Sequence, residues 1–294
     1  MVIISHIIYS MLFLTVLLLC FISAHSTINP SKVVYAVNCG GGSYTAPDGV
    51  VYAADKGYSA GVASDYGTQF TIKYTKSPSV YQTERYALDT FSYEIPLTQA
   101  GKYVLILKFS EVYFSSEGEK VFHVKIGDKE VVHSLDIYKK VGKAAAYDEF
   151  IELTVRDGKL IYQDNEVKNA WDGDVMRVEF VKTGRDNPKV NGIVLVAGGL
   201  EDTNYNEMKT FLEQRIKAKE AQQVKAQSKA IEEEDKQVNE VLDFEPFEQD
   251  IKIEESDSLL AVITSGPAIG VIGVVLLFVS FALFSSKESK PKSH

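Results

Sequence analysis

The stretch Met176-Arg177-Val178-Glu179-Phe180 decides the fold class, because its apolar residues occupy every second position. Successive side chains of a β-strand point to opposite faces of the sheet, so this alternation predicts a strand with one buried face. The segment 151–155 repeats the pattern, with Ile, Leu and Val alternating with Glu and Thr. Both segments therefore predict half-buried strands.

Short β-rich runs separated by turn residues continue through residues 33–199. Gly127-Asp128 and Asp157-Gly158 are typical hairpin turns between such runs. With no long helical pattern among them, about ten strands predict an all-β fold, a β-sandwich or jelly roll, over residues 27–200. The expected strands are Val33–Asn38, Gln69–Tyr74, Ser92–Leu97, Lys102–Phe109, Lys120–Ile126, Glu130–Leu135, Glu149–Val155, Lys159–Tyr162, Val175–Val181 and Gly192–Ala197.

The sequence after Leu200 is rich in Glu, Lys, Gln and Ala and contains neither Gly nor Pro until Pro246. This composition predicts a helix over residues 206–242. Its apolar residues are too irregularly spaced for a clear heptad, which favours a charged, solvated stalk over a weak coiled coil. We expect residues 201–258 to form an acidic, partly helical linker, flexible from residue 243 onward.

Charge is distributed unevenly along the chain. Residues 201–258 hold 17 acidic and 8 basic residues, an excess that equals the whole net charge of −9. The domain that precedes this linker is therefore close to neutral. Such a balance argues against a nucleic-acid partner and fits an uncharged ligand such as a sugar.

Both ends of the chain carry membrane-targeting signals. An apolar run over residues 11–22, followed by small residues, predicts a signal peptide over residues 1–26 that is cleaved near residues 24–26. Residues 259–284 are uncharged and long enough for one transmembrane helix. Lysines follow that segment, so the tail at residues 285–294 is expected in the cytosol, as in a type I single-pass protein.

Lys290 and Lys292 stand fifth and third from the C-terminus. This spacing resembles the dilysine signal that retrieves membrane proteins to the endoplasmic reticulum, and it predicts that location. Ordinary stop-transfer charges are the alternative explanation.

The cysteine count excludes an internal disulfide in the mature chain. Cys20 lies in the predicted signal peptide, which leaves only Cys39. We expect Cys39 to be a buried small apolar residue, with an intermolecular bridge as the alternative.

Several aromatic residues stand where predicted strands give way to loops. They lie in Ala63-Ser64-Asp65-Tyr66-Gly67, in the segment 81–86, and in Glu111-Val112-Tyr113-Phe114, while a carboxylate occurs in the segment 186–190. The C–H faces of a pyranose lie well on aromatic rings, and a carboxylate can accept two sugar hydroxyls. Taken singly, each tyrosine is better explained by partial burial in a sandwich.

A series of motifs in this order resembles the malectin family. They are VVYAVNCGG, DGVVYAAD, ASDYG, YQTERY, TFSYEIP, YVLILKFSEVYF, KVFHVKIG and DNPKV, and they span residues 33 to about 199. Malectins are lumenal lectins of the endoplasmic reticulum with a β-sandwich domain, an acidic linker and a C-terminal membrane helix. The loop 75–80 is shorter than in vertebrate malectins, which could alter the reach to a sugar.

The resemblance implies a non-catalytic lectin that binds α-linked glucose disaccharides and glucosylated high-mannose N-glycans on newly made glycoproteins. It also implies ribophorin of the oligosaccharyltransferase as a partner by analogy. Gly67 is expected to let the backbone approach a sugar hydroxyl. The implied carbohydrate-binding residues are Tyr66, Gly67, Tyr86, Tyr113, Phe114 and Asp186.

The sequence gives less support to other functions. A glycosidase needs two facing carboxylates, and no paired motif stands out. His123 and His133 could lie on neighbouring strands but lack a further Cys or His, so no metal site and no cofactor are expected. A cell-surface, malectin-like ectodomain that binds a peptide or a polysaccharide is the alternative to the lectin.

Overall fold

The computed structural model describes residues 27–242. Most of the regular structure in the described chain is β-sheet, arranged as three sheets, with each strand pair antiparallel except the short parallel pair β1–β3. Eight strands form the largest sheet, in the order β12 (Asn165–Glu166), β11 (Lys159–Tyr162), β10 (Tyr147–Arg156), β7 (Gly101–Phe109), β15 (Gly192–Ala197), β1 (Val33–Asn38), β3 (Val51–Ala54) and β2 (Tyr44–Thr45).

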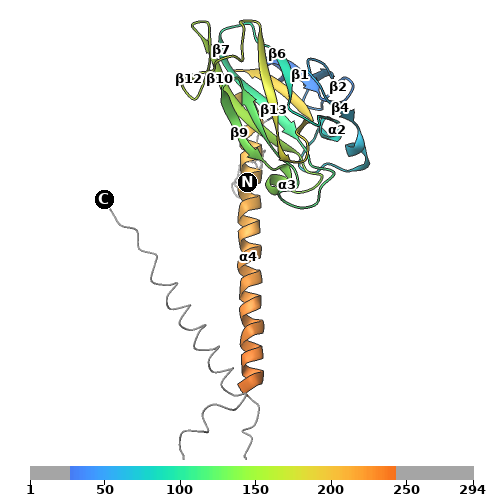
Figure 1. The fold of residues 1–294 in the computed structure, drawn as a ribbon, viewed down its shortest axis with the longest axis vertical. Coiled ribbons are helices and arrows are strands. Elements are labelled where there is room, and N and C mark those ends of the chain that lie inside the picture. The colour runs from blue at the N-terminus through green and yellow to red at the C-terminus, as the bar shows by residue number, and fades with distance from the viewer. Residues whose placement is uncertain (1–26, 243–294) are drawn as a thin grey trace, which may run out of the picture. The chain divides into compact units, whose positions relative to one another are not determined.

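Two smaller sheets complete the domain (Figure 1). The four-stranded sheet has the order β6 (Phe91–Pro96), β13 (Val175–Arg185), β8 (Val121–Ile126) and β9 (Lys129–Leu135). The three-stranded sheet has the order β14 (Lys189–Val190), β5 (Glu84–Tyr86) and β4 (Val62–Ser64). Three short helices lie between strands: η2 (Tyr66–Gln69), α2 (Pro78–Gln82) and α3 (Ile137–Val141). Two others flank the strands, η1 (Pro30–Lys32) before β1 and η3 (Leu200–Asp202) after β15.

The eight- and four-stranded sheets share one apolar core. Leu105 and Leu107 of β7 belong to the same buried cluster as Tyr93 of β6 and Phe180 of β13. The opposite face of β7 contributes Val104 and Ile106 to a second cluster, which also contains residues of the loops and of α2. Strand β7 is therefore buried on both faces, which explains its unbroken apolar run.

Most of the expected strands match observed ones within two residues, the longer β13 excepted, and the all-β prediction is confirmed. The strand expected over Gln69–Tyr74 is wrong. Residue Gln69 ends η2, Lys73 forms only an isolated bridge to Ala145, and Tyr74 has a positive φ of 63°. Ile72 is buried against the second core cluster, so this segment covers the sheet instead of extending it.

The helix expected over residues 206–242 is present as α4 (Tyr205–Leu242). Its first turns pack on the domain: Met208 joins the core cluster, and the rings of Phe211 and Tyr74 lie 4.2 Å apart. Farther along, Ile216 and Val224 are exposed. Residues 27–242 contain no helix that is long and apolar enough to cross a membrane, and the predicted anchor at 259–284 lies outside the described residues, as does the predicted signal peptide.

Cys39 is a free thiol and is completely buried. Burial raises its pKa well above the ordinary value. The interpretation as a buried apolar residue is therefore confirmed, and its inaccessibility in the folded domain disfavours an intermolecular bridge.

Candidate functional site

Exposed aromatic rings gather beside the three-stranded sheet. Tyr66 opens η2, and its ring lies 6.2 Å from the ring of Tyr113, in an edge-to-face arrangement. The Tyr66 ring also lies 5.6 Å from Phe70, and Tyr113 lies 5.0 Å from Phe114. Tyr113 is 69% exposed and Tyr66 is 42% exposed. Large apolar rings held open to solvent in this way form a platform for a ligand.

A buried carboxylate holds the loop that carries Tyr113 and Phe114. Oε1 of Glu111 accepts hydrogen bonds from the backbone N–H groups of Tyr113 (2.8 Å) and Phe114 (3.1 Å). Nζ of Lys143 donates to the Tyr113 carbonyl oxygen and lies above the Phe70 ring. The two rings of the loop are thus fixed by charged groups on both sides of the backbone.

Lys120 connects the carboxylate of Asp186 to these rings. Nζ of Lys120 lies 2.7 Å from Oδ2 of Asp186 and 5.5 Å from the centre of the Phe114 ring. Burial raises the pKa of Asp186, but the hydrogen bonds from Lys120 and Asn187 and the charges of Lys120 and Lys182 outweigh it. The net pKa is therefore below the ordinary value, so Asp186 is ionised at neutral pH.

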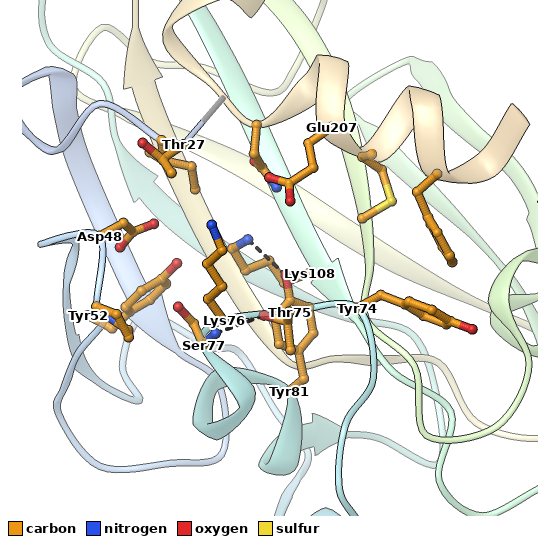
Figure 2. Close-up of a pocket in the computed structure, with 15 residues that line it drawn as sticks. Thr27, Asp48, Tyr52, Tyr74, Thr75, Lys76, Ser77, Tyr81, Lys108 and Glu207 are labelled. Atoms are coloured by element: carbon orange, nitrogen blue, oxygen red, sulfur yellow. Dashed lines mark hydrogen bonds between the residues drawn. The ribbon is translucent and has the colours of Figure 1, made fainter. Parts of the chain in front are cut away.

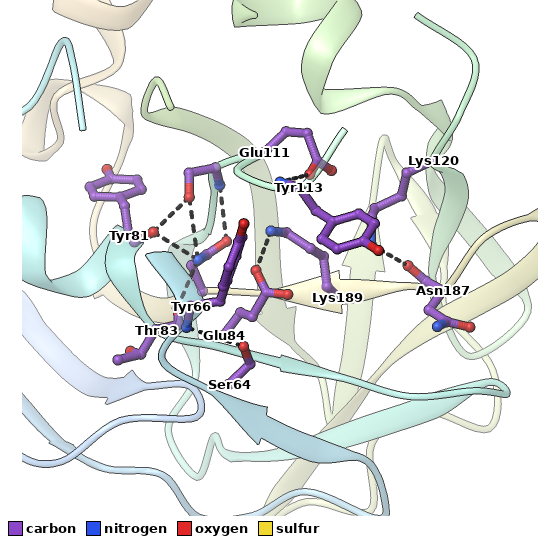
Figure 3. A network of polar contacts seen from close by, with 12 residues as sticks. Ser64, Tyr66, Tyr81, Thr83, Glu84, Glu111, Tyr113, Lys120, Asn187 and Lys189 are labelled. Carbon is purple, nitrogen blue, oxygen red and sulfur yellow. Dashed lines mark hydrogen bonds and ion pairs between the residues drawn. The ribbon is translucent and has the colours of Figure 1, made fainter. Parts of the chain in front are cut away.

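A second ion pair lies beneath the rings. Glu84 and Tyr86 point to the same face of β5, and Lys189 of β14 lies opposite Tyr86 in the register. Nζ of Lys189 forms an ion pair with Oε2 of Glu84, and Figure 3 shows this contact between Tyr66 and Tyr113. Although burial lowers the pKa of Lys189, the charges of Glu84, Glu111 and Asp186 raise it by more.

The family model of the malectin domain matches residues 33–193. The chain belongs to the malectin family. It is 42% identical over 182 residues to Malectin-A of Xenopus laevis, which covers 61% of this chain and 65% of that protein. It is also 42% identical over 176 residues to human Malectin, with 59% of each chain covered. The chain thus matches about three fifths of the length of these curated relatives.

Solved structures that superpose on this chain are more distant in sequence. The extracellular domain of ANXUR2 from Arabidopsis thaliana is 17% identical, with 57% of this chain and 50% of that chain covered and a TM-score of 0.47. A beta-glucuronidase of Bacteroides uniformis is 21% identical, with 56% and 18% covered and a TM-score of 0.42. Neither likeness bears on what this malectin domain binds.

The malectin domain brings four of the expected site residues into one connected group: Tyr66, Tyr113, Phe114 and Asp186. Tyr86 lies on the adjoining three-stranded sheet, opposite Lys189 and half-buried. Lys290 and Lys292, the predicted retrieval signal, lie outside the described residues.

The structure shows a packing role for Gly67 that the sequence did not predict. Gly67 is buried, and a Cβ built there would lie 2.5 Å from the carbonyl oxygen of Gln82 in α2. The space beside this glycine is thus occupied by the protein's own backbone. Gly67 lets η2 pack on α2 and thereby fixes Tyr66, and the approach of its backbone to a sugar hydroxyl stays a prediction.

Sequence reasoning missed the charged residues that orient the rings. Glu111, Lys120, Lys143 and Lys189 lie on separate segments, and no periodic pattern connects them to the tyrosines. The one signal in the sequence is Glu111 itself, which stands two positions before Tyr113 in the motif that carries the aromatic pair.

A separate cavity of about 390 Å³ lies between the domain and the start of α4 (Figure 2). Below it, Nζ of Lys108 lies 2.8 Å from Oδ2 of Asp148, and the Tyr81 hydroxyl donates to Oδ1 of Asp148 at 2.6 Å. Nδ2 of Asn204 donates to the same carboxylate at 2.8 Å. This buried network satisfies the charges internally and ties the residue before α4 to the domain. Tyr74 and Phe211 line the cavity, so it is a second candidate site for a ligand.

Proposed function

We propose that this malectin domain is a lectin that binds α-linked glucose disaccharide units without cleaving them. The observation that carries the proposal is the exposed edge-to-face pair Tyr66 and Tyr113, which Phe114 and Lys120 connect to the ionised carboxylate of Asp186. The rings offer an apolar surface to the C–H faces of a sugar. The carboxylate offers a charged acceptor to its hydroxyls.

The state of the carboxylates supports holding a glycan rather than hydrolysing it. A glycosidase needs one carboxyl group with a raised pKa as general acid and a second one facing it. The pKa of Asp186 is instead lowered, and Glu84 is paired with Lys189. Oε1 of Glu111 is occupied by two backbone N–H groups. Asp186, ionised and paired with Lys120, is not suited to donate a proton to a leaving oxygen.

A glycan array with the purified protein tests the proposal. We expect signals for α-glucosyl ligands that Asp186→Ala and Tyr86→Ala each weaken by about 1 to 3 kcal/mol, through loss of a charged hydrogen bond or of a stacked ring. Unchanged binding in both variants would remove these residues from the site. Release of glucose from an α-glucoside by the native protein would instead favour an enzyme.

We further propose the glucosylated high-mannose N-glycans of newly made glycoproteins as the natural ligand, in the lumen of the endoplasmic reticulum. A single anchor at residues 259–284 would hold the domain there, with α4 and the acidic linker between them and ribophorin as a neighbouring partner. The support is the family membership together with the sequence of the two ends.

The tail separates this location from the cell-surface alternative. A reporter that carries residues 259–294 should stay in the endoplasmic reticulum, and replacing Lys290 and Lys292 with serine should send it to the surface. A reporter that reaches the surface equally well with both lysines intact would contradict retrieval and favour the surface ectodomain.

A further inference from the structure

Two histidines and a glutamate converge on the outer side of the β8–β9 hairpin. Oε1 of Glu130 lies 3.1 Å from Nδ1 of His123 and also contacts Nδ1 of His133. The possible ligand atoms of the three residues all lie within 4.8 Å of one another. All three side chains are at least partly exposed, so an ion could reach them.

Two bulges in β9 produce this convergence. Phe122 pairs with Leu135 but Val124 pairs with Val132, and Lys125 then pairs with Glu130, so β9 has an extra residue at two points. In a regular strand, residues 130 and 133 would point to opposite faces. Ser134 has a φ of 47°, a conformation that costs a residue other than glycine free energy. Bulges that redirect side chains in this way are common beside functional sites.

The two contacts of the His123 Nδ1 atom require opposite protonation states of that nitrogen. Nδ1 accepts from the backbone N–H of Ser134 at 3.3 Å, which requires a lone pair on that nitrogen. The same nitrogen faces the Glu130 carboxylate oxygen at 3.1 Å, which requires a proton there instead. A metal ion between Nδ1 and the carboxylate would take this lone pair and hold the carboxylate without a proton, in place of the long contact with Ser134.

We propose that His123, Glu130 and His133 bind a divalent transition metal ion such as Zn²⁺. Two imidazoles and one carboxylate are a donor set suited to Zn²⁺, and nitrogen ligands disfavour Mg²⁺ and Ca²⁺. Tetrahedral ligands with bonds of about 2.1 Å stand about 3.4 Å apart. The 3.1 Å between Nδ1 of His123 and Oε1 of Glu130 is close to this value, and rotation of the exposed His133 side chain can adjust the other two separations. The fourth position is open to water.

The sequence predicted no metal here because it offered only two histidines. Glu130 becomes the third ligand only through the bulges of β9. Since β9 is an edge strand of its sheet, a bound ion would join this edge to β8 and stabilise the hairpin by mass action.

Calorimetric titration of the full chain with Zn²⁺, after removal of metal with a chelator, tests the proposal. We expect one site per chain that Mg²⁺ does not compete for, and a Tm that rises with added Zn²⁺. His133→Gln and Glu130→Gln should each weaken binding by about tenfold or more and remove the rise in Tm. The matched control is Glu166→Gln, which removes an exposed carboxylate from the neighbouring β11–β12 hairpin and should bind Zn²⁺ normally.

A second readout identifies the ligands. With Cu²⁺ in place of Zn²⁺, electron paramagnetic resonance should show two nitrogen ligands in the native chain and one in His133→Gln. Absence of Zn²⁺ binding, or equal binding by His133→Gln and Glu130→Gln through other histidines of the chain, would overturn the proposal. All three side chains are at the surface, so the variants should keep the metal-free Tm of the native protein.

Discussion

Nζ of Lys120 lies 2.7 Å from Oδ2 of Asp186, and this ion pair connects the carboxylate to the aromatic part of the candidate site. Asp186 has a φ of 52°, so its backbone is in a left-handed conformation at the turn after β13. Lys120 is largely buried and precedes β8, where it also lies over the Phe114 ring. One lysine therefore fixes both the carboxylate and a ring.

Replacement of Lys120 by methionine should weaken sugar binding by about 1 to 2 kcal/mol, because Asp186 loses the charged hydrogen bond that orients it. Methionine keeps an apolar stem beside Phe114. The pKa of Asp186 should rise toward its ordinary value, since burial remains while the hydrogen bond and charge of Lys120 are lost. Calorimetry measures the affinity, and an NMR titration of the Asp186 carboxyl carbon measures the pKa. Lys125→Met in β8, the strand that follows Lys120, is the control, and equal sugar affinity in both variants would contradict the role of Lys120.

Tyr113 and Tyr74 distinguish the two places where a sugar could bind. Both are exposed tyrosines, but Tyr113 belongs to the ring platform and Tyr74 lines the cavity beside α4. We expect Tyr113→Ala to weaken binding of an α-glucose disaccharide by about 1 kcal/mol or more through loss of ring contact. Tyr74→Ala should leave the affinity unchanged. The reverse result would move the binding site to the cavity.

The sequence allowed the strands and the aromatic part of the site to be predicted, for different reasons. Alternation in the segment 176–180 follows directly from burial of one strand face, so β13 was predictable. Tyr66 and Asp186 were predicted only through family resemblance, because loop residues have no period. The partner Lys120 could not be predicted, since its contact with Asp186 depends on how β8 and the turn after β13 meet in space.

The two bulges of β9 could not be predicted from the sequence either. A bulge depends on pairing with the neighbouring strand, which the sequence does not show. The apolar residues Val132 and Leu135 are three positions apart, which does not fit the two-residue period of a regular strand, although the strand was predicted as regular. The short strands β4, β5 and β14 were missed because three residues or fewer are too short for a pattern. These pieces position Tyr86 and Lys189, which explains why the resemblance indicated the rings but not their supports.

Gly67→Ala should destabilise the domain by about 1 to 3 kcal/mol even without a sugar, because the added methyl group meets the Gln82 backbone in α2. Sugar affinity should fall as well, since Tyr66 moves with η2. Urea unfolding and calorimetry measure the two effects. Gly184→Ala is the control, because a Cβ there meets nothing within 4 Å. A Gly67→Ala protein of native stability that has lost sugar binding would instead restore direct approach of the sugar to this glycine.

Asp148→Ala should cost about 3 to 5 kcal/mol of stability, because it leaves the Lys108 ammonium buried without its partner. The double variant Lys108→Met with Asp148→Leu should recover most of this loss, since it removes both charges. Urea unfolding provides the free energies. A single variant that loses less than about 1 kcal/mol would show that water reaches Lys108 and replaces the carboxylate.

Glu149→Gln should raise the Tm at neutral pH. Burial raises the pKa of Glu149, and the hydrogen bond from Tyr147 and the charge of Lys140 offset this only in part. An acid with a higher pKa in the folded state binds its proton more tightly there than in the unfolded state. Its contribution to stability therefore falls as pH rises from the unfolded pKa, about 4.3, to the folded pKa, and stays reduced above it.

Glutamine removes this ionisation while its amide oxygen can still accept from the Tyr147 hydroxyl. The difference in Tm between variant and native protein should consequently be small below about pH 4 and grow in favour of the variant toward pH 7. Calorimetric scans across this range measure it, with Glu152→Gln, an exposed position on the same strand, as the control. A difference that does not change with pH would show that Glu149 ionises as easily in the folded domain as in the unfolded chain.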